Sequence, residues 1–572
     1  MIKLGQILKK KNLVTDQQIK EGLDRQRKSG ERLGSVLVKM GFITEEDLLT
    51  ALSGQLGLPY VKLKELAIDP AAFKKLPAKF AWHYGIMPVS LKGNVLTVAT
   101  SDPMLPLNDV KLRLGCEIGQ VLALENDITE FIKKYYGIGA DTVERIIAKT
   151  PQQSVETYKS TPEVEDILKI TEDASVINLV NQILLDAKEK NATDIHIEPY
   201  RDKLGIRYRI DGILYHANLP KDIERFFSAI ISRIKIIARL NIIERRIPQD
   251  GRASIKVGKE EFDMRISTIP TRYGEGVVIR ILPSTMLFGL ERLGLEEDNL
   301  KILEGLIKKP HGVIFVTGPT GSGKTTTLYT CLNKIKSSEN KIITIEDPIE
   351  YELEGISQIQ VTPEINFGFA DGLRSMLRHD PDIMMIGEVR DFETAELAIR
   401  AALTGHLVFS TLHTNDSAGG ITRLLDIGVQ PFLLASSVEA FIAQRLVRII
   451  CTSCKQEDKS VSKDAKLQII HSIFGKELSQ EDLKQKLSVK FYKGKGCEKC
   501  NSTGFRGRTA ISEILQVTKS IRESILKKAS SDAIKDVAVK EGMKTLGCSG
   551  WGKITKGLTT LDEVLKITQV IE

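Results

Sequence analysis

The stretch from Val313 to Leu328 constrains the fold of this chain more than any other. It reads V-I-F-V-T-G-P-T-G-S-G-K-T-T-T-L, which is an apolar run typical of a buried strand, then a glycine-rich turn, then a helix-compatible run. The turn fits G-x-x-x-x-G-K-[ST] at every fixed position. Glycines let backbone N–H groups approach phosphate oxygens, and the following helix presents its positive end. We therefore expect a nucleoside triphosphate to bind here, and a chance glycine-rich loop is the alternative.

The turn also predicts a role for its individual residues. Lys324 would reach the β- and γ-phosphates, and the Thr325 hydroxyl would ligate Mg²⁺. The residues expected to bind ATP are Gly318, Pro319, Thr320, Gly321, Ser322, Gly323, Lys324, Thr325 and Thr326.

Three further apolar runs predict strands of a parallel sheet. They span residues 342–345, 383–386 and 407–411, and polar residues follow each of them. In a parallel sheet these polar residues share one edge, where ligands bind. Carboxylates there can hold Mg²⁺ through water or orient the attacking water, so Glu346 and Glu388 are both candidates. The sequence does not rank the two.

Two histidines flank the third run. His406 precedes it and His413 follows it, and either could sense the γ-phosphate. A lone histidine at a strand end is more often structural, so that alternative stays open for both.

The bulk composition bounds the class of protein. A chain of 572 residues is long enough for several domains, each with its own core. No stretch approaches 18 uncharged apolar residues and the N-terminus lacks a signal-peptide pattern, so we expect a cytoplasmic protein. The net charge of +7 permits anionic partners without requiring them. Aromatic content is 6 %, and no basic stripe interleaved with aromatic residues is present, which argues against nucleic acid as a partner.

Four of the seven cysteines form two C-x-x-C pairs. Cys451 and Cys454 make the first pair, and Cys497 and Cys500 make the second. Two such pairs predict a closed tetrahedral Zn²⁺ site with a structural role, and a redox pair is the alternative. The spacer between the pairs is longer than in simple zinc ribbons, so we expect a helical insertion such as residues 464–474.

The first sixty residues contain a repeat with an offset of 29 positions. Lys3-Leu4-Gly5 recurs as Arg32-Leu33-Gly34, and each copy continues into a helix with a capping-box start. The leucines alone are explained by a small helical bundle. The double pattern also resembles the cyclic-di-GMP-binding module found ahead of some pilus and secretion ATPases. That resemblance implies binding by Leu4, Gly5, Arg32, Leu33, Gly34 and Gly41. The first copy departs from the pattern with Lys3, Asn12 and Gly22, which weakens its half-site.

A second unit with several arginines begins near Ala174. Residues 193–199 alternate as a strand does, and 206–210 with the turn Asp211-Gly212 predict a hairpin. Arginines recur on strand-like alternation at Arg207, Arg209, Arg252, Arg265 and Arg280. A solvated strand face is the simpler interpretation. Alternatively, these arginines supply charge to the phosphates of a neighbouring subunit.

The order of the motifs resembles one family over nearly the whole chain. The phosphate-binding turn, I-T-I-E-D-P-I-E, G-E-V-R-D and T-G-H-L-V-F-S-T-L-H-T-N-D, together with D-I-H-I-E-P and P-Q-D-G-R, are similar to the assembly ATPases of type IV pili and type II secretion. The resemblance implies a homohexamer with ATP at subunit interfaces, Glu346 as general base and Glu388 as the Mg²⁺-side carboxylate. It also implies roles for His413 and for arginines acting in trans, Arg209, Arg265 and Arg280.

The resemblance also predicts partners and a direction of action. It implies an inner-membrane platform protein and cytoplasmic assembly proteins as partners, with peripheral attachment to the inner membrane. Retraction motors of this family usually lack the zinc element and the long N-terminal region, so extension of a type IV pilus is the first expectation. Type II secretion is the runner-up within the family. A nucleic-acid motor and a nucleotide-sensing switch are the alternatives outside it.

The expected fold is multidomain α/β, with a RecA-like parallel-sheet ATPase core. Five segments are predicted: a duplicated cyclic-di-GMP-binding-like module at 1–62, an α+β docking domain at 63–140, a linker at 141–172, a PAS-like domain at 173–285, and the ATPase domain at 286–572 with its zinc element at 448–510.

Overall fold

A computed structural model describes residues 4–29, 31–136, 174–201, 203–219, 223–258, 260–282, 289–475 and 478–568. The chain forms two compact units, Met1–Ser284 and Thr285–Glu572, and each is described by itself. The linker predicted at 141–172 lies outside the described residues.

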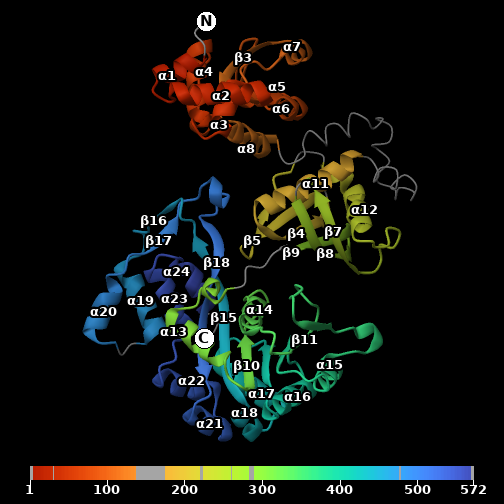
Figure 1. Cartoon of the computed structure of the whole chain (residues 1–572), viewed down its shortest axis with the longest axis vertical. Helices are drawn as coiled ribbons and strands as arrows, with labels where there is room; N and C mark the ends of the chain where they lie inside the picture. Colours follow the sequence, from red (N-terminus) through yellow and green to blue (C-terminus); the bar gives the residue numbers. More distant parts are fainter. Residues whose placement is uncertain are drawn as a thin grey trace. The chain divides into compact units, whose positions relative to one another are not determined.

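The N-terminal part of the first unit is α+β (Figure 1). Its helices are α1 (Leu4–Lys10), α2 (Asp16–Ser29), α3 (Leu33–Lys39), α4 (Glu45–Leu56), α5 (Pro70–Lys75), α6 (Ala78–Tyr84), α7 (Asn108–Leu114) and α8 (Glu125–Tyr136). The strands β1 (Met87–Lys92), β2 (Val95–Thr100) and β3 (Glu117–Leu122) form a sheet in that order, with β1–β2 antiparallel and β2–β3 parallel.

The two copies of the sequence repeat pack reciprocally. A Cβ on Gly34 would lie 2.6 Å from the Leu48 side chain and 3.3 Å from Leu4, and a Cβ on Gly5 would lie 3.4 Å from Ile19 and 3.8 Å from Leu33. These glycines therefore let each copy's first helix approach the other copy closely. Both capping boxes are present, in the first copy at residues 15–18 and in the second at 44–47.

The second part of the first unit is a six-stranded antiparallel sheet. Its elements are α11 (Ala174–Glu189), β4 (Ala192–Pro199), β5 (Leu204–Ile210), β6 (Ile213–His216), α12 (Phe227–Ile237), β7 (Gln249–Val257), β8 (Glu260–Thr271) and β9 (Gly274–Leu282). The strand order is β6-β5-β4-β9-β8-β7, and apolar residues of both helices pack with those of the sheet. The predicted hairpin is confirmed, because Asp211 and Gly212 both have positive φ and join the paired residues Ile210 and Ile213.

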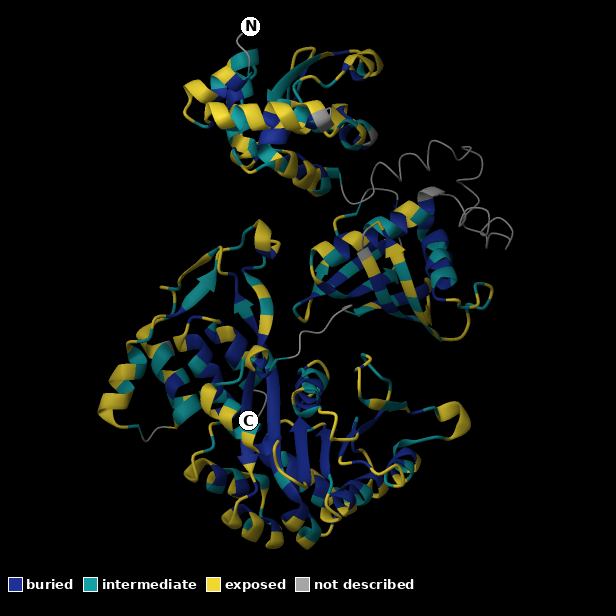
Figure 2. Ribbon diagram, in the orientation of Figure 1, coloured by how far each residue is buried: buried dark blue, intermediate teal, exposed yellow. Residues whose placement is uncertain are grey.

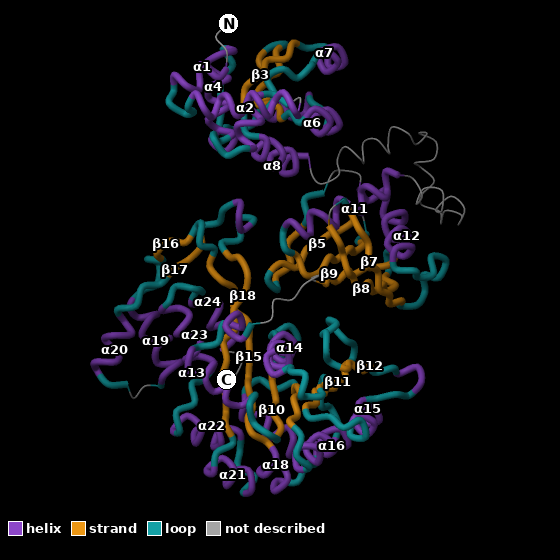
Figure 3. Tube along the Cα trace, viewed as in Figure 1, coloured by secondary structure: helices purple, strands orange, loops and turns teal. Residues whose placement is uncertain are grey.

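The second unit is built on a seven-stranded sheet with helices on both faces (Figure 3). Its strands are β10 (Gly312–Thr317), β11 (Ile342–Glu346), β12 (Ser357–Gln360), β13 (Ile383–Ile386), β14 (Leu407–Leu412), β15 (Val438–Ile450) and β18 (Phe505–Gln516). Its helices are α13 (Glu297–Leu306), α14 (Lys324–Ile335), α15 (Phe369–Met376), α16 (Phe392–Leu403), α17 (Ser417–Ile427), α18 (Pro431–Ser437), α21 (Lys519–Leu526), α22 (Ser531–Lys540), α23 (Leu546–Thr555) and α24 (Leu561–Thr568).

The order of the large sheet is β12-β11-β13-β14-β10-β15-β18, and every neighbouring pair is parallel except β15–β18. The central strands are buried on both faces (Figure 2). The multidomain α/β prediction with a parallel-sheet core is confirmed, as are the four predicted strands β10, β11, β13 and β14.

The sequence analysis did not identify the two long strands β15 and β18. Buried polar side chains such as Gln444, Arg445 and Arg448 interrupt the apolar pattern of β15. These two strands carry the cysteine element, which holds β16 (Lys455–Glu457), β17 (Tyr492–Gly494), α19 (Lys463–Phe474) and α20 (Gln480–Leu487). Helix α19 matches the predicted helical insertion. Across the described ranges, no helix is long and apolar enough to cross a membrane.

Candidate nucleotide site and metal centre

The glycine-rich turn connects β10 to α14. It has no room for a side chain at Gly318 or Gly323, the two glycines that the motif fixes. A Cβ on Gly318, where φ is +151°, would lie 2.6 Å from Ser322 Oγ and 2.7 Å from the Gln444 carbonyl. Gly323 is the N-cap of α14 with φ +86°, and its Cβ would lie 2.8 Å from Gln444 Nε2. Glycine is therefore required at both positions by backbone conformation and by space.

Two polar groups of the turn fit an anionic ligand. The Ser322 hydroxyl is buried and makes no hydrogen bond within the part of the chain that the structure describes. Lys324 Nζ donates to the carbonyls of Gly318 at 2.7 Å and Pro319 at 3.2 Å, so it lies over its own loop. Burial lowers the pKa of Lys324 to about 8, with Arg445 lowering and Glu388 raising it. A phosphate would give both groups a better partner.

Two buried residues of β15 make hydrogen bonds to the turn and to the loop after β14, and the sequence analysis missed both. Gln444 accepts a hydrogen bond from the Thr327 hydroxyl at 2.7 Å and donates to the Ser322 carbonyl at 2.9 Å. Arg445 donates to the Asn415 carbonyl at 2.7 Å, from the loop after β14. The turn is therefore fixed by the strand next to β10, and only the pairing of β10 with β15 reveals this.

Glu346 is the last residue of β11, and Glu388 and His413 follow the carboxyl ends of β13 and β14. Because these strands run parallel to β10 in the same sheet, the three residues lie along the same edge of the sheet as the turn. The structure thus brings the predicted carboxylates and the predicted phosphate-binding turn to one edge.

The two carboxylates have different surroundings. Glu388 pairs with Arg390, and its Oε2 lies 3.3 Å from His413 Nε2. The Glu388 side chain is partly exposed, so its carboxylate can face a metal ion. Thr325 is the second residue of α14, directly after Lys324. If Mg²⁺ binds here, Thr325 and Glu388 would hold it, and the ion would neutralise charge on the phosphates.

Glu346 is buried, with 3 % of its surface exposed, and neutral donors surround it. Tyr329 donates to its Oε2. Thr344 Oγ1 at 2.7 Å and Gln358 Nε2 at 3.0 Å donate to its Oε1. The sequence analysis identified none of these three partners, because they come from α14, β11 and β12 and converge only in the fold.

Of the two roles left open for His406, the structure supports the structural one. His406 precedes β14, and its backbone carbonyl accepts a hydrogen bond from the amide of Gly312 at the start of β10. It therefore lies at the amino edge of the sheet, a strand length of about 20 Å from His413. Its Nδ1 contacts the Ala401 carbonyl at 2.8 Å, which is a structural role.

The arginines predicted to act in trans form a row across the six-stranded sheet of the first unit. The register pairs Arg209 with Asp194, Asp194 with Arg280, Arg280 with Arg265, and Arg265 with Arg252. Asp194 is buried, and its Oδ1 accepts from Arg280 Nε at 3.0 Å. The arginines therefore share one face of one sheet. Their action on another subunit's phosphates stays a prediction.

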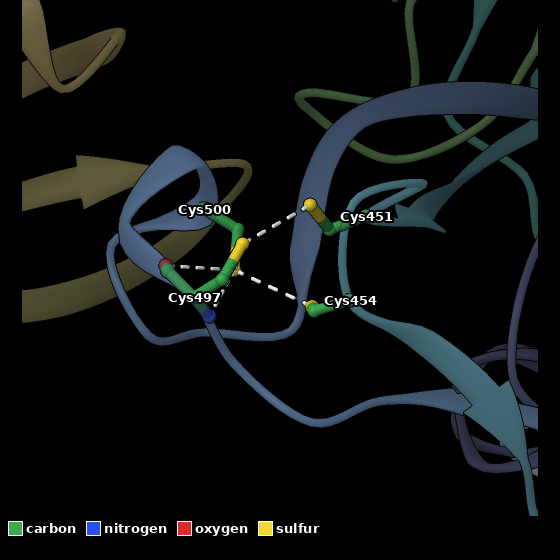
Figure 4. A group of neighbouring side chains, drawn as sticks. All are labelled: Cys451, Cys454, Cys497 and Cys500. Carbon is green, nitrogen blue, oxygen red and sulfur yellow. Dashed lines mark hydrogen bonds between the residues drawn. The ribbon is translucent and has the colours of Figure 1, made fainter. Parts of the chain in front are cut away.

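The four cysteines of the two C-x-x-C pairs converge, although 42 residues separate the pairs (Figure 4). The Sγ–Sγ separations are 3.8 Å for Cys451–Cys497, 3.9 Å for Cys454–Cys500 and 3.7 Å for Cys497–Cys500. A tetrahedral ZnS₄ centre with ordinary Zn–S bonds has edges of about 3.8 Å. The cluster therefore has the size that Zn²⁺ requires.

The backbone around Cys500 supports a thiolate. Its Sγ accepts from the amides of Cys497 at 3.2 Å and Gly504 at 3.3 Å. Burial raises the pKa of Cys500, but these donors outweigh it and bring that pKa down to about 7. Such N–H···S bonds orient a metal ligand. If Zn²⁺ binds here, the four thiolates would close its coordination sphere and its role would be structural.

We expect the purified chain to carry one zinc ion, and we expect chelation to lower its melting temperature, because the ion holds two distant segments together. Cys500→Ser should lose the metal, measured by elemental analysis. Cys548→Ser is the matched control, since Cys548 lies outside the cluster. Protein that is metal-free as purified and melts unchanged after chelation would contradict a structural zinc site.

The residues predicted to bind cyclic-di-GMP divide into two groups. Leu4, Gly5, Leu33 and Gly34 take part in the packing between the two repeats. Arg32 is exposed and forms an ion pair with Asp102 at 2.6 Å. Gly41 has φ +73° with open space around it, and Asn12, its counterpart in the first copy, has φ +55°. Asparagine tolerates this conformation, which explains the departure at that position.

Two family models match the chain. The model described as "Type II/IV secretion system protein" matches residues 169–566, and the MshEN domain model matches residues 56–142. The first match covers more than half of the chain. The chain belongs to the type II/IV secretion system protein family. It is an ATPase of this family. The phosphate-binding turn, at the sheet edge with Glu346 and Glu388, is the nucleotide site expected of such a protein.

Relatives of this secretion family span the whole chain. The type IV pilus assembly ATPase PilB of Myxococcus xanthus (strain DK1622) is 41 % identical over 567 residues, covering 98 % of each chain. The type II secretion system protein E of Xanthomonas campestris pv. campestris is 39 % identical over 95 % of this chain and 94 % of its own length. A solved structure of the pilus retraction motor PilT with bound ADP is 27 % identical, covering 68 % of this chain and 96 % of that chain, with a TM-score of 0.46.

Proposed function

We propose that this ATPase powers the polymerisation of pilin in a type IV pilus. In this account the chain forms a cytoplasmic homohexamer at the inner membrane, hydrolyses Mg²⁺-ATP, and moves an inner-membrane platform protein with each cycle. The observation that carries the proposal is the shared sheet edge of the phosphate-binding turn, Glu346 and Glu388, on a chain 41 % identical end to end to a pilus assembly ATPase.

The proposed division of labour follows the surroundings of the two carboxylates. Lys324 and the amides of the turn would bind the β- and γ-phosphates, and Glu388 with Thr325 would face Mg²⁺. Glu346, held by neutral donors, would orient and deprotonate the attacking water. Arg209, Arg265 and Arg280 would add positive charge from a neighbouring subunit, which suits arginine because it stays ionised and donates bidentately.

The type II secretion motor is the second candidate, because a relative with that name is 39 % identical over nearly the same length. A deletion strain separates the two machines. We expect loss of surface filaments with normal secreted proteins, restored by the wild-type gene. Intact filaments with exoproteins trapped in the periplasm would make this chain the secretion motor instead.

A nucleic-acid motor is a third possibility that one assay tests. The steady-state ATP turnover of the purified chain should be the same with and without DNA. Stimulation of turnover by single- or double-stranded DNA would favour the nucleic-acid motor over the proposed function.

We also propose that the duplicated repeat binds cyclic-di-GMP. Arg32 supports this, because it is exposed, lies on a repeat that resembles such a module, and pairs with Asp102 of the segment matched by the MshEN model. Its present partner is Asp102, a carboxylate that a ligand phosphate would replace.

Two substitutions at this pair should shift cyclic-di-GMP affinity in opposite directions. Arg32→Ala should weaken binding about tenfold, because a charged hydrogen bond to phosphate is lost. Asp102→Asn should strengthen it, because the competing carboxylate is removed. Isothermal titration measures both, with Arg25→Ala on α2 as the exposed control. Equal affinity in all four proteins would reject this site.

A further inference from the structure

We propose that Tyr329 is the positioning residue of the general base, fixing the Glu346 carboxylate to the helix that follows the phosphate-binding turn. The inference rests on the proposed role of Glu346 in hydrolysis. It assigns a function to a tyrosine whose side chain is fully buried.

The position of Tyr329 on α14 links the two halves of the site. Tyr329 lies four residues after Thr325, so both side chains emerge on the same face of the helix. Thr325 begins that face at the phosphate end, and Tyr329 meets the carboxyl end of β11 one turn later. Any movement of α14 that accompanies nucleotide binding therefore reaches Glu346 directly.

The Tyr329 hydroxyl both donates and accepts a hydrogen bond. The Tyr329 oxygen accepts from the amide of Glu350 at 3.4 Å, and the hydroxyl proton is then available to Glu346 Oε2. The ring is fully buried and lies edge-on against Tyr351 at 6.2 Å between centroids. The hydroxyl is thus held in place by packing rather than by a flexible side chain.

The two oxygens of Glu346 have different roles in this arrangement. Oε1 accepts from both Thr344 and Gln358, which uses its two lone pairs. Within the described residues, Tyr329 is the one donor to Oε2, and this leaves one lone pair of Oε2 for the proton of the attacking water. In this proposal Oε1 holds the carboxylate in place, and Oε2, oriented by Tyr329, accepts the proton of the attacking water. Removal of the Tyr329 hydroxyl therefore removes the donor that orients Oε2 and leaves the two donors to Oε1 in place.

The test compares Tyr329→Phe with Glu346→Gln and with the double variant, using purified full-length chain. Tyr329→Phe should lower kcat about tenfold and leave KM for ATP unchanged, because the phenyl ring preserves packing and the nucleotide contacts lie elsewhere. In the Glu346→Gln background the same change should cost almost nothing, because the carboxylate it positions is gone. Tyr351→Phe removes a hydroxyl from the adjacent ring and is the matched control.

Thr344→Val, which removes a donor to Oε1, should show the same dependence on Glu346. Wild-type kcat in Tyr329→Phe, or equal losses with and without Glu346, would overturn the positioning role while leaving Glu346 as the base. Wild-type turnover in Glu346→Gln would instead overturn the assignment of the base itself, and the positioning role with it.

Discussion

Lys324→Ala should lose ATP turnover by about a thousandfold or more. The lysine is the cation that the turn itself provides for the β- and γ-phosphates, and its charge is needed most as negative charge develops on the transferred group. In the structure it already lies over the turn, where it donates to the carbonyls of Gly318 and Pro319. Deleting it leaves those carbonyls facing the phosphates with no neutralising charge.

Phosphate release at saturating Mg²⁺-ATP measures this loss, and binding of a fluorescent ATP analogue shows how much of it is lost affinity. Lys301→Ala is the matched control, because Lys301 is an exposed lysine of α13 paired with Glu297. Wild-type turnover in Lys324→Ala would exclude the turn as the site of hydrolysis.

Glu346→Gln should bind ATP with nearly wild-type affinity and hydrolyse it at least about a hundredfold more slowly. The amide keeps the size of the side chain but cannot accept the proton of the attacking water, and a general base contributes about this much. With the amide oxygen in the place of Oε1, Thr344 and Gln358 can still donate to it, and the amide nitrogen in the place of Oε2 can donate to the Tyr329 hydroxyl, so the fold of β11 should persist.

Single-turnover hydrolysis with nucleotide occupancy measured in the same sample distinguishes slow chemistry from weak binding. Glu352→Gln, an exposed glutamate of the loop after β11, is the control. If Glu346→Gln turns over at the wild-type rate and Glu388→Gln does not, the roles of the two carboxylates are exchanged.

Local sequence patterns predicted the parts of the nucleotide site that follow one another along the chain. The turn from Gly318 to Thr325 is continuous in sequence, Glu346 directly follows an apolar run, and Glu388 lies two residues after another. Parallel strands bring such positions to one edge whatever the details of packing. The cysteine cluster could also be predicted, because two C-x-x-C pairs in one chain are typical of a zinc site.

The contacts that hold these residues in place could not be predicted from the sequence, because they depend on which strands and helices become neighbours. Gln444 reaches the turn only because β15 pairs with β10. Tyr329 reaches Glu346 only because α14 lies against the sheet that contains β11. The sequence left the same two roles open for His406 and His413, and only the fold separates them, because β14 puts them at opposite edges of the sheet.

The sharpest test of the central claim is piliation in a strain whose sole copy of this gene encodes Glu346→Gln. If hydrolysis at this site drives pilin polymerisation, the strain should make the protein at wild-type levels and assemble no surface filaments, and the Glu352→Gln strain should be fully piliated. Filaments of wild-type number and length on the Glu346→Gln strain would contradict the account.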